Sequence, residues 1–185
     1  APVNVTDQPW VDVVPGDLDG DGDVDLAFNY ASGITLLENT GSAWAPYATL
    51  QSPYTTSRLV LHDLNADGFD DLVHLTDAVV RCHINDGSGG LVRRDLPDSL
   101  AQDVAVGDID LDGKPDLIYG PANTLRWLRN TGGGYFAPSI TISATTGVAN
   151  RVELADVDAD GDLDVVTSSA EKGLIALYEN YTLAP

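Results

Sequence analysis

Aspartate is unusually dense in one short segment of the sequence, GDLDGDGDVDL at residues 16–26. Five aspartates stand at every second position there, and glycine fills two of the gaps between them. Carboxylates held this close repel one another unless a cation or hydrogen-bond donors compensate their charge. The segment therefore indicates a place where several carboxylate oxygens converge on one cation.

The same pattern occurs four times along the chain. Asp-x-Asp/Asn-x-Asp-Gly-x-x-Asp begins at Asp17, Asp63, Asp108 and Asp156, and successive copies start 46, 45 and 48 residues apart. Accidental matches would not keep so even a spacing. The period predicts one supersecondary unit that is used four times.

Oxygen atoms at positions 1, 3, 5 and 9, with the backbone carbonyl of position 7, supply the six or seven ligands that Ca²⁺ prefers. Glycine at position 6 allows the sharp turn that brings them together. Mg²⁺ is less suitable, because it demands a strict octahedron and retains water. We predict four calcium sites, and their ligands are Asp17, Asp19, Asp21 and Asp25 with the carbonyl of Asp23; Asp63, Asn65, Asp67 and Asp71 with that of Phe69; Asp108, Asp110, Asp112 and Asp116 with that of Lys114; and Asp156, Asp158, Asp160 and Asp164 with that of Asp162.

Two other readings of the loops remain open. An EF-hand shares the first six positions but needs a glutamate at position 12, where this chain has Phe28, His74, Tyr119 and Thr167. The other alternative is a set of solvated Asp/Gly turns without metal. Four complete copies favour calcium over both.

Short alternating apolar runs flank each loop, as expected of β-strands rather than helices. Asn-Thr-Gly and Asn-Asp-Gly segments farther along each unit are typical hairpin turns. We therefore predict an all-β single domain over residues 1–185, a β-propeller of four blades with about four antiparallel strands each. The repeats span approximately residues 10–54, 55–100, 101–147 and 148–185, and residues 1–8 complete the last blade as its outer strand and close the ring.

On the strand before each loop, the charges alternate in sign at Asp12, Arg58, Asp103 and Arg151. The pattern favours a closed ring with an even number of blades, although separate solvated charges explain it about as well. The N-terminal strand could instead complete a neighbouring molecule and produce a homo-oligomer or filament.

The loops, together with LLENTG and WLRNTGGGYFAP, resemble FG-GAP/VCBS repeats, the calcium-binding blades of integrin alpha-chain propellers and certain fungal lectins. The resemblance covers nearly the whole chain. It implies a calcium-stabilised binding module, secreted or at the cell surface, that recognises carbohydrate or an extracellular protein. A structural subunit assembled by strand exchange is the alternative, and an accessory domain of a polysaccharide-degrading enzyme comes third.

Composition narrows the classes of partner. The formal net charge of −20 argues against nucleic acid, and no apolar run is long enough to insert into a membrane. Cys82 is the single cysteine, so it forms no internal disulfide. Sequons at Asn4 and Asn180 are compatible with a secreted glycoprotein.

We expect no enzyme activity, because no convincing catalytic set is present outside the calcium loops. The histidines, His62, His74 and His83, all belong to the second repeat, where core or surface roles are favoured over a metal site. Trp127 aligns with Leu36, Cys82 and Leu177 and is expected in the core. Better candidates for stacking against a ligand are Trp10, Trp44, Tyr30 and Tyr54, although aromatic packing between blades explains them about as well.

Overall fold

The computed structural model describes residues 10–30, 33–51, 56–96, 100–144, 147 and 149–181. These residues form β-strands joined by turns and loops, so the all-β prediction is confirmed. No helix long and apolar enough to cross a lipid bilayer occurs in this part of the chain.

Each repeat folds into an antiparallel sheet whose strands follow one another in sequence order, and we call these four sheets blades 1 to 4. Blade 1 contains β1 (Trp10–Gly16), β2 (Asp25–Tyr30), β3 (Gly33–Asn39) and β4 (Trp44–Gln51). Blade 2 contains β5 (Thr56–His62), β6 (Asp71–Thr76), β7 (Val79–Asn85) and β8 (Leu91–Arg94). Blade 3 contains β9 (Val104–Gly107), β10 (Asp116–Tyr119), β11 (Leu125–Leu128) and β14 (Ile140–Ser143). Blade 4 contains β15 (Arg151–Ala155), β16 (Asp164–Ser169) and β17 (Leu174–Tyr178).

A fifth sheet, not predicted, pairs β12 (Asn130–Gly132) with β13 (Tyr135–Phe136). It extends blade 3 beyond an irregularity, because β12 follows β11 after Arg129 and Ala137 N donates to the Arg129 carbonyl at 2.9 Å. Pro138, which has no N–H to donate, lies between β13 and β14. The pairing is interrupted there, and the described sheets number five rather than four.

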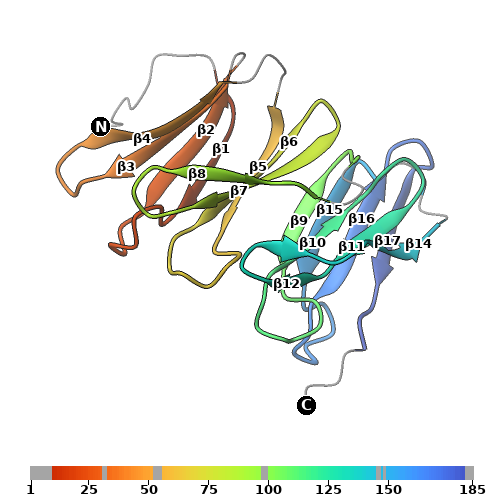
Figure 1. The fold of residues 1–185 in the computed structure, drawn as a ribbon. Helices are drawn as coiled ribbons and strands as arrows, with labels where there is room; N and C mark the ends of the chain where they lie inside the picture. Colours follow the sequence, from red (N-terminus) through yellow and green to blue (C-terminus); the bar gives the residue numbers. More distant parts are fainter. Residues whose placement is uncertain are drawn as a thin grey trace.

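The prediction of a closed ring is wrong. The sheets lie side by side in an open arc, with blade 1 and blade 4 at its two ends (Figure 1). Blade 4 has three strands in the described chain, so the predicted outer strand is not among them. Residues 1–8, which were expected to supply that strand, lie outside the described residues.

The core lies between blades rather than within one sheet. Each blade has a leading face, toward the preceding blade in sequence, and a trailing face, toward the next one. Leu18, Ile34 and Leu36 of blade 1 pack against Leu59 and Leu72 of blade 2. Similar apolar clusters join blade 2 to blade 3 and blade 3 to blade 4. Each blade therefore depends on its neighbour to bury its apolar side chains.

Candidate metal centre

The four acidic loops occupy the same place in their blades, between the first and second strands. In each, the residue before the loop pairs with the ninth loop residue, as in Gly16 with Asp25 and His62 with Asp71. Blades 3 and 4 keep this register through the pairs of Gly107 with Asp116 and Ala155 with Asp164. The strand register thus fixes both ends of every loop.

All four loops share one backbone conformation. The fourth residue has a positive φ in each, 77° at Gly20, 62° at Ala66, 57° at Leu111 and 65° at Ala159. The sixth residue is the repeated glycine, with φ between 83° at Gly113 and 99° at Gly161. Only glycine adopts such angles without strain, which explains its presence at the sixth position.

The first aspartate of each loop accepts hydrogen bonds from the loop backbone. Asp17 receives the N–H groups of Gly20 at 2.8 Å and Gly22 at 3.1 Å. Asp63 receives those of Ala66 at 2.8 Å and Gly68 at 2.9 Å. Equivalent bonds reach Asp108 and Asp156 from the glycine at position 6, at 2.8 Å and 3.1 Å. These bonds hold the loop in a tight curve with its carboxylates close together.

The ninth aspartate is fully buried in every copy, a role that the ligand assignment did not foresee. Asp71 accepts from the N–H groups of Leu64 and Asn85, both at 2.8 Å, and so ties its loop to the end of β7. Asp25, Asp116 and Asp164 make the same pair of bonds in their blades. Burial raises the pKa of Asp71 to about 7 and that of Asp116 to about 6.

Three of the four predicted carboxylate sets come together at positions 1, 3 and 9. In each set, one oxygen of every residue lies within 4.8 Å of the others, and the sets are Asp17, Asp19 and Asp25; Asp108, Asp110 and Asp116; and Asp156, Asp158 and Asp164. These acidic clusters could hold metal ions. Burial, and then the neighbouring carboxylates of Asp21, Asp25 and Asp17, raise the pKa of Asp19, so a cation would relieve an existing repulsion.

The second loop differs because its third residue is Asn65. The Asn65 side-chain amide donates to Asp67 at 2.8 Å, and the Asp67 N–H donates to the Asn65 side-chain oxygen at 3.0 Å. An amide oxygen is still a suitable Ca²⁺ ligand. With Asp63 and Asp71, this loop keeps oxygen donors at all four side-chain positions.

In the third loop, cationic side chains lie on the predicted ligands. Lys114 Nζ donates to Asp112 Oδ2 at 2.8 Å, and this bond lowers the pKa of Asp112. Arg129 binds Asp110 through Nε and Asp112 through Nη2, the latter at 2.9 Å. These cations compensate part of the carboxylate charge of the third loop, while Asp110 Oδ1 is buried without a hydrogen-bond partner among the described residues.

The remaining predicted ligands are the fifth and seventh residues. Asp21, Asp67 and Asp160 are exposed and Asp112 is half-buried, and none of them belongs to the three carboxylate clusters. At the seventh position, Asp23 is exposed, Lys114 is half-buried and Asp162 is buried. Phe69 has a second role, because its ring packs so closely on Gly20 that an added Cβ would lie 2.9 Å from it.

A repeated asparagine joins each loop to the preceding blade, and we call this contact the asparagine clasp. Asn85 Nδ2 donates to the carbonyl of Leu18 at 2.7 Å, and Asn130 Nδ2 donates to that of Leu64 at 2.7 Å. Asn180 Nδ2 donates to Ile109 O at 2.8 Å. Because N-glycosylation uses this same nitrogen, a glycan at Asn180 would break the clasp; Asn4 lies outside the described residues.

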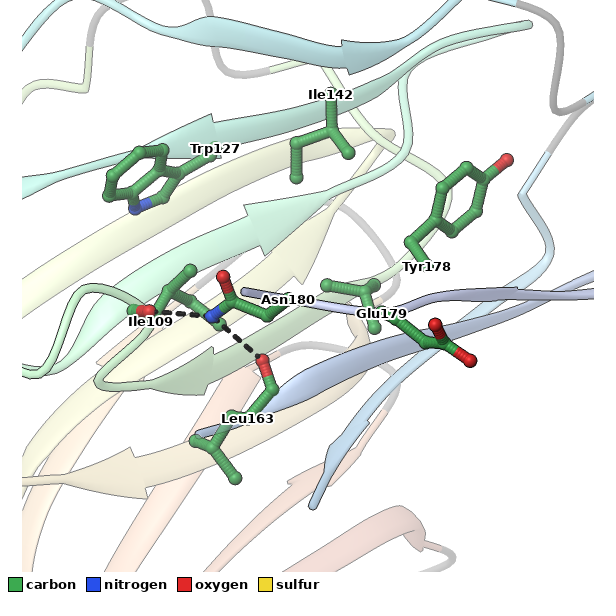
Figure 2. Close-up of a pocket in the computed structure, with 8 residues that line it drawn as sticks. Ile109, Trp127, Ile142, Leu163, Tyr178, Glu179 and Asn180 are labelled. Atoms are coloured by element: carbon green, nitrogen blue, oxygen red, sulfur yellow. Dashed lines mark hydrogen bonds between the residues drawn. The ribbon is translucent and has the colours of Figure 1, made fainter. Parts of the chain in front are cut away.

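A pocket of about 170 Å³ opens between blades 3 and 4 (Figure 2). Trp127 and Ile142 come from blade 3, and Tyr178 and Glu179 come from the end of blade 4. The clasp from Asn180 to Ile109, with a second bond to Leu163 O at 3.3 Å, lies at its floor. Trp127 packs on the core as expected, but it also lines this pocket, which sequence alignment among the repeats did not suggest.

The other aromatic candidates do not line this pocket. Trp44 and Tyr30 are half-buried at strand ends of blade 1, and Tyr54 and the side chain of Trp10 lie outside what the structure describes. His74 and His83 are buried and stacked, with ring centroids 5.2 Å apart, whereas His62 is exposed. Cys82 is a buried free thiol, in keeping with its expected core role.

Comparison with known proteins agrees with the repeat. An FG-GAP-like repeat model matches residues 17–74, 63–119 and 108–167. No curated protein matches the chain.

Among solved structures, an Agrocybe aegerita lectin that specifically recognises non-reducing terminal N-acetylglucosamine superposes with a TM-score of 0.66 at 18% identity. The alignment covers 84% of this chain and 46% of the lectin. The Photorhabdus luminescens Tc holotoxin pore gives a TM-score of 0.63 at 22% identity, over 100% of this chain and 9% of the toxin chain. This chain therefore spans less than half the length of either neighbour, and the likeness concerns the fold. The chain belongs to the FG-GAP-like repeat family.

Proposed function

We propose that this chain is an extracellular, non-enzymatic binding module that calcium stabilises and that recognises carbohydrate. The observation that carries the proposal is the pocket between blades 3 and 4, which combines two aromatic side chains with polar groups. Ligand sites of this kind are mostly apolar and use a few polar groups to fix orientation. The Trp127 and Tyr178 rings offer apolar faces to a sugar ring, and the Glu179 carboxylate offers an acceptor for its hydroxyls.

The pocket also has a rigid base. Its floor carries the asparagine clasp, and Ile109 and Leu163, which accept those bonds, belong to the third and fourth acidic loops. Calcium bound to these loops would supply positive charge among the carboxylates and hold the loop backbone in one conformation. The ion would thus stabilise the pocket without taking part in a reaction.

Terminal N-acetylglucosamine is the first ligand to test, since the lectin neighbour is known for recognising it. The direct experiment measures the binding of N-acetylglucosamine-terminated glycans by calorimetry in saturating calcium. A glycan array under the same conditions tests a wider set of sugars. The informative variant is Trp127→Leu, because leucine is the residue at the equivalent position of blade 1, Leu36. We expect it to weaken binding at least tenfold, on the order of the 1.4 kcal/mol that a lost aromatic contact contributes.

Trp44→Leu is the matched control, since it removes a tryptophan that does not line the pocket, and it should bind like the wild type. Thermal unfolding of both variants checks that the fold is intact. Failure of every glycan to bind, or full binding by a folded Trp127→Leu variant, would refute a carbohydrate site at this pocket.

A further inference from the structure

The trailing face of blade 4 exposes apolar side chains that the other blades bury. Ile34, Val80 and Leu125 occupy equivalent positions in blades 1 to 3 and are no more than 3% exposed. The corresponding residue of blade 4, Ile175, is 77% exposed. Val157 and Leu177 on the same face are 51% and 44% exposed, whereas their equivalents in blade 1, Leu18 and Leu36, are fully buried. This face lies at the open end of the arc (Figure 1).

In the interior of the arc, the leading face of the next blade covers these positions. Leu59 and Leu72 of blade 2 cover Ile34 and Leu36 of blade 1, for example. The repeat therefore indicates what kind of surface would cover the trailing face of blade 4. That surface is the leading face of another blade of the same kind. Blade 1, at the opposite end of the arc (Figure 1), carries Val13 and Leu26 at the positions of Leu59 and Leu72, and Val13 is exposed.

The asparagine clasp supports this match independently. Asn39 of blade 1 stands where Asn85, Asn130 and Asn180 stand in the other blades, and its side-chain oxygen accepts Gly41 N as Asn85 accepts Gly87 N. Its side-chain amide donates to no carbonyl of another blade within the described residues. At the other end of the arc, Val157 occupies the second position of its loop. The residues at that position in blades 1 to 3 supply the carbonyl that accepts the clasp, and they are Leu18, Leu64 and Ile109. Each end of the arc thus carries one half of one clasp.

Charged residues on the first strands also support a contact between blade 4 and blade 1. Arg58 lies 3.6 Å from Asp103 of the next blade, and Arg151 lies 3.8 Å from Asp103 of the preceding blade. Asp103 also accepts the Val152 N–H of the next blade at 2.8 Å, as Asp12 accepts that of Leu59 at 3.1 Å. Arg151 already binds Glu153 at 2.8 Å, and an aspartate on a blade after blade 4 would stand beside it as Asp103 stands beside Arg58. Asp12 of blade 1 is such an aspartate.

We propose that the trailing face of blade 4 binds the leading face of blade 1 of a second copy of this chain. The inference goes beyond the proposed function, because it concerns assembly and not the sugar pocket. Ile175, Leu177 and Val157 become buried, Asn39 donates to the Val157 carbonyl of the other copy, and Asp12 meets its Arg151. The two faces differ, so the contact is head-to-tail, and two copies that satisfy both contacts form a closed ring.

The test measures mass in solution by light scattering and sedimentation over a range of protein concentrations in calcium. The wild type should associate head-to-tail at high micromolar concentration, as a closed pair where two arcs complete a ring and as longer oligomers where they do not. Ile175→Asp places a charge in the contact and should raise the dissociation constant at least tenfold. It should leave the folded chain intact, because Ile175 is already exposed. Asn39→Leu damages the other end of the chain and should weaken association as well.

A mixture of the two variants gives the sharpest result. A mixed pair contains one undamaged contact, between the leading face of the Ile175→Asp chain and the trailing face of the Asn39→Leu chain. The mixture should therefore associate more strongly than either variant alone. Ile140→Asp is the matched control, since Ile140 lies on the outer strand of blade 3, is 51% exposed and should not affect the mass.

A wild type that stays monomeric at every concentration would overturn the proposal, because another partner must then cover the face. Undiminished association of Ile175→Asp, or a mixture no stronger than its components, would overturn it too. Glycan binding is measured at the pocket between blades 3 and 4, so its failure would leave these mass measurements unaffected.

Discussion

The ninth and fifth loop residues form two classes, because the ninth serves the fold as well as the carboxylate cluster, whereas the fifth is assigned only to the predicted cation site. The ninth aspartate is buried and accepts two backbone N–H groups, whereas the fifth is exposed in three of the four loops. All were assigned as ligands from the sequence, because spacing reveals oxygen donors but not burial. The two classes are expected to differ when calcium is removed.

The second loop allows a matched comparison of the two classes. In Asp71→Asn, one amide hydrogen must face the N–H of Leu64 or Asn85 in a buried site, which should cost about 2–3 kcal/mol of unfolding free energy even with chelator present. Asp67→Asn should leave stability in chelator nearly unchanged and reduce only the stabilisation that calcium adds. Urea unfolding with and without calcium measures both. Equal losses for the two variants in chelator would contradict the distinction.

The stacked histidines give a second prediction, on pH. Burial lowers the pKa of His74 to about 3 and that of His83 to about 4, against 6.5 for an accessible histidine. Below pH 6.5, these two histidines therefore become protonated in the unfolded chain but stay neutral in the folded chain. The two histidines should therefore lower the free energy of unfolding as the pH decreases from 6.5 toward 4, by up to about 1.4 kcal/mol per pH unit each. The raised pKa values of Asp71 and Asp116 act in the opposite direction, so the histidine effect is measured as a difference between variants.

The repeat supplies the variant that tests the histidine prediction. His74→Phe with His83→Leu installs the residues found at the equivalent positions of blade 1, Phe28 and Leu37. Urea unfolding at pH 7, 6 and 5 should show that acidification lowers the stability of the wild type relative to that of this variant. The control His62→Gln changes an exposed histidine and should follow the wild type. Parallel pH curves for all three proteins would show that the buried pair has no such effect.

At the scale of elements, the acidic loops depend on glycine at position 6. Gly68 has a φ of 92°, and an added Cβ there would meet nothing within 4 Å, so an alanine suffers from backbone strain alone. Gly68→Ala should lower the free energy of unfolding by about 1–2 kcal/mol and weaken calcium binding at the same loop. Ala66→Gly, two residues earlier at a φ of 62°, relieves similar strain and should not destabilise. Urea unfolding and calcium titration measure both, and a neutral Gly68→Ala would contradict the requirement for glycine.

Much of the strand layout could be predicted from the sequence. The repeated loops fixed the period, and alternating apolar residues on either side identified the strands that the structure shows, such as β5 and β6 around the second loop. The separate sheet of β12 and β13 could not be foreseen in this way, because the equivalent segment of blade 1 also contains a proline, Pro46, and forms the unbroken strand β4. The pocket role of Trp127 also needed the structure, since a pocket depends on how blade 4 sits against blade 3.

At the scale of the whole molecule, the same repeats led to a wrong prediction, that of a closed ring of blades. Four equal units suggested a complete ring, yet the sheets form an open arc (Figure 1). A repeat pattern specifies the contact between neighbouring blades but does not fix how many blades complete a circle. The exposed trailing face of blade 4 carries apolar side chains at the positions that neighbouring blades cover elsewhere in the arc.

The proposed calcium sites would connect the loops, the blades and the pocket, so the calcium stoichiometry is the most direct measurement of the central claim. The metal-free protein, prepared with chelator and dialysed, is titrated with Ca²⁺ by calorimetry while its melting temperature is followed in parallel. We expect four ions per chain, one for each loop, and a higher melting temperature at saturation, because the ligands are assembled only in the folded state. A stoichiometry near zero, with the same melting temperature in calcium and in chelator, would contradict the claim.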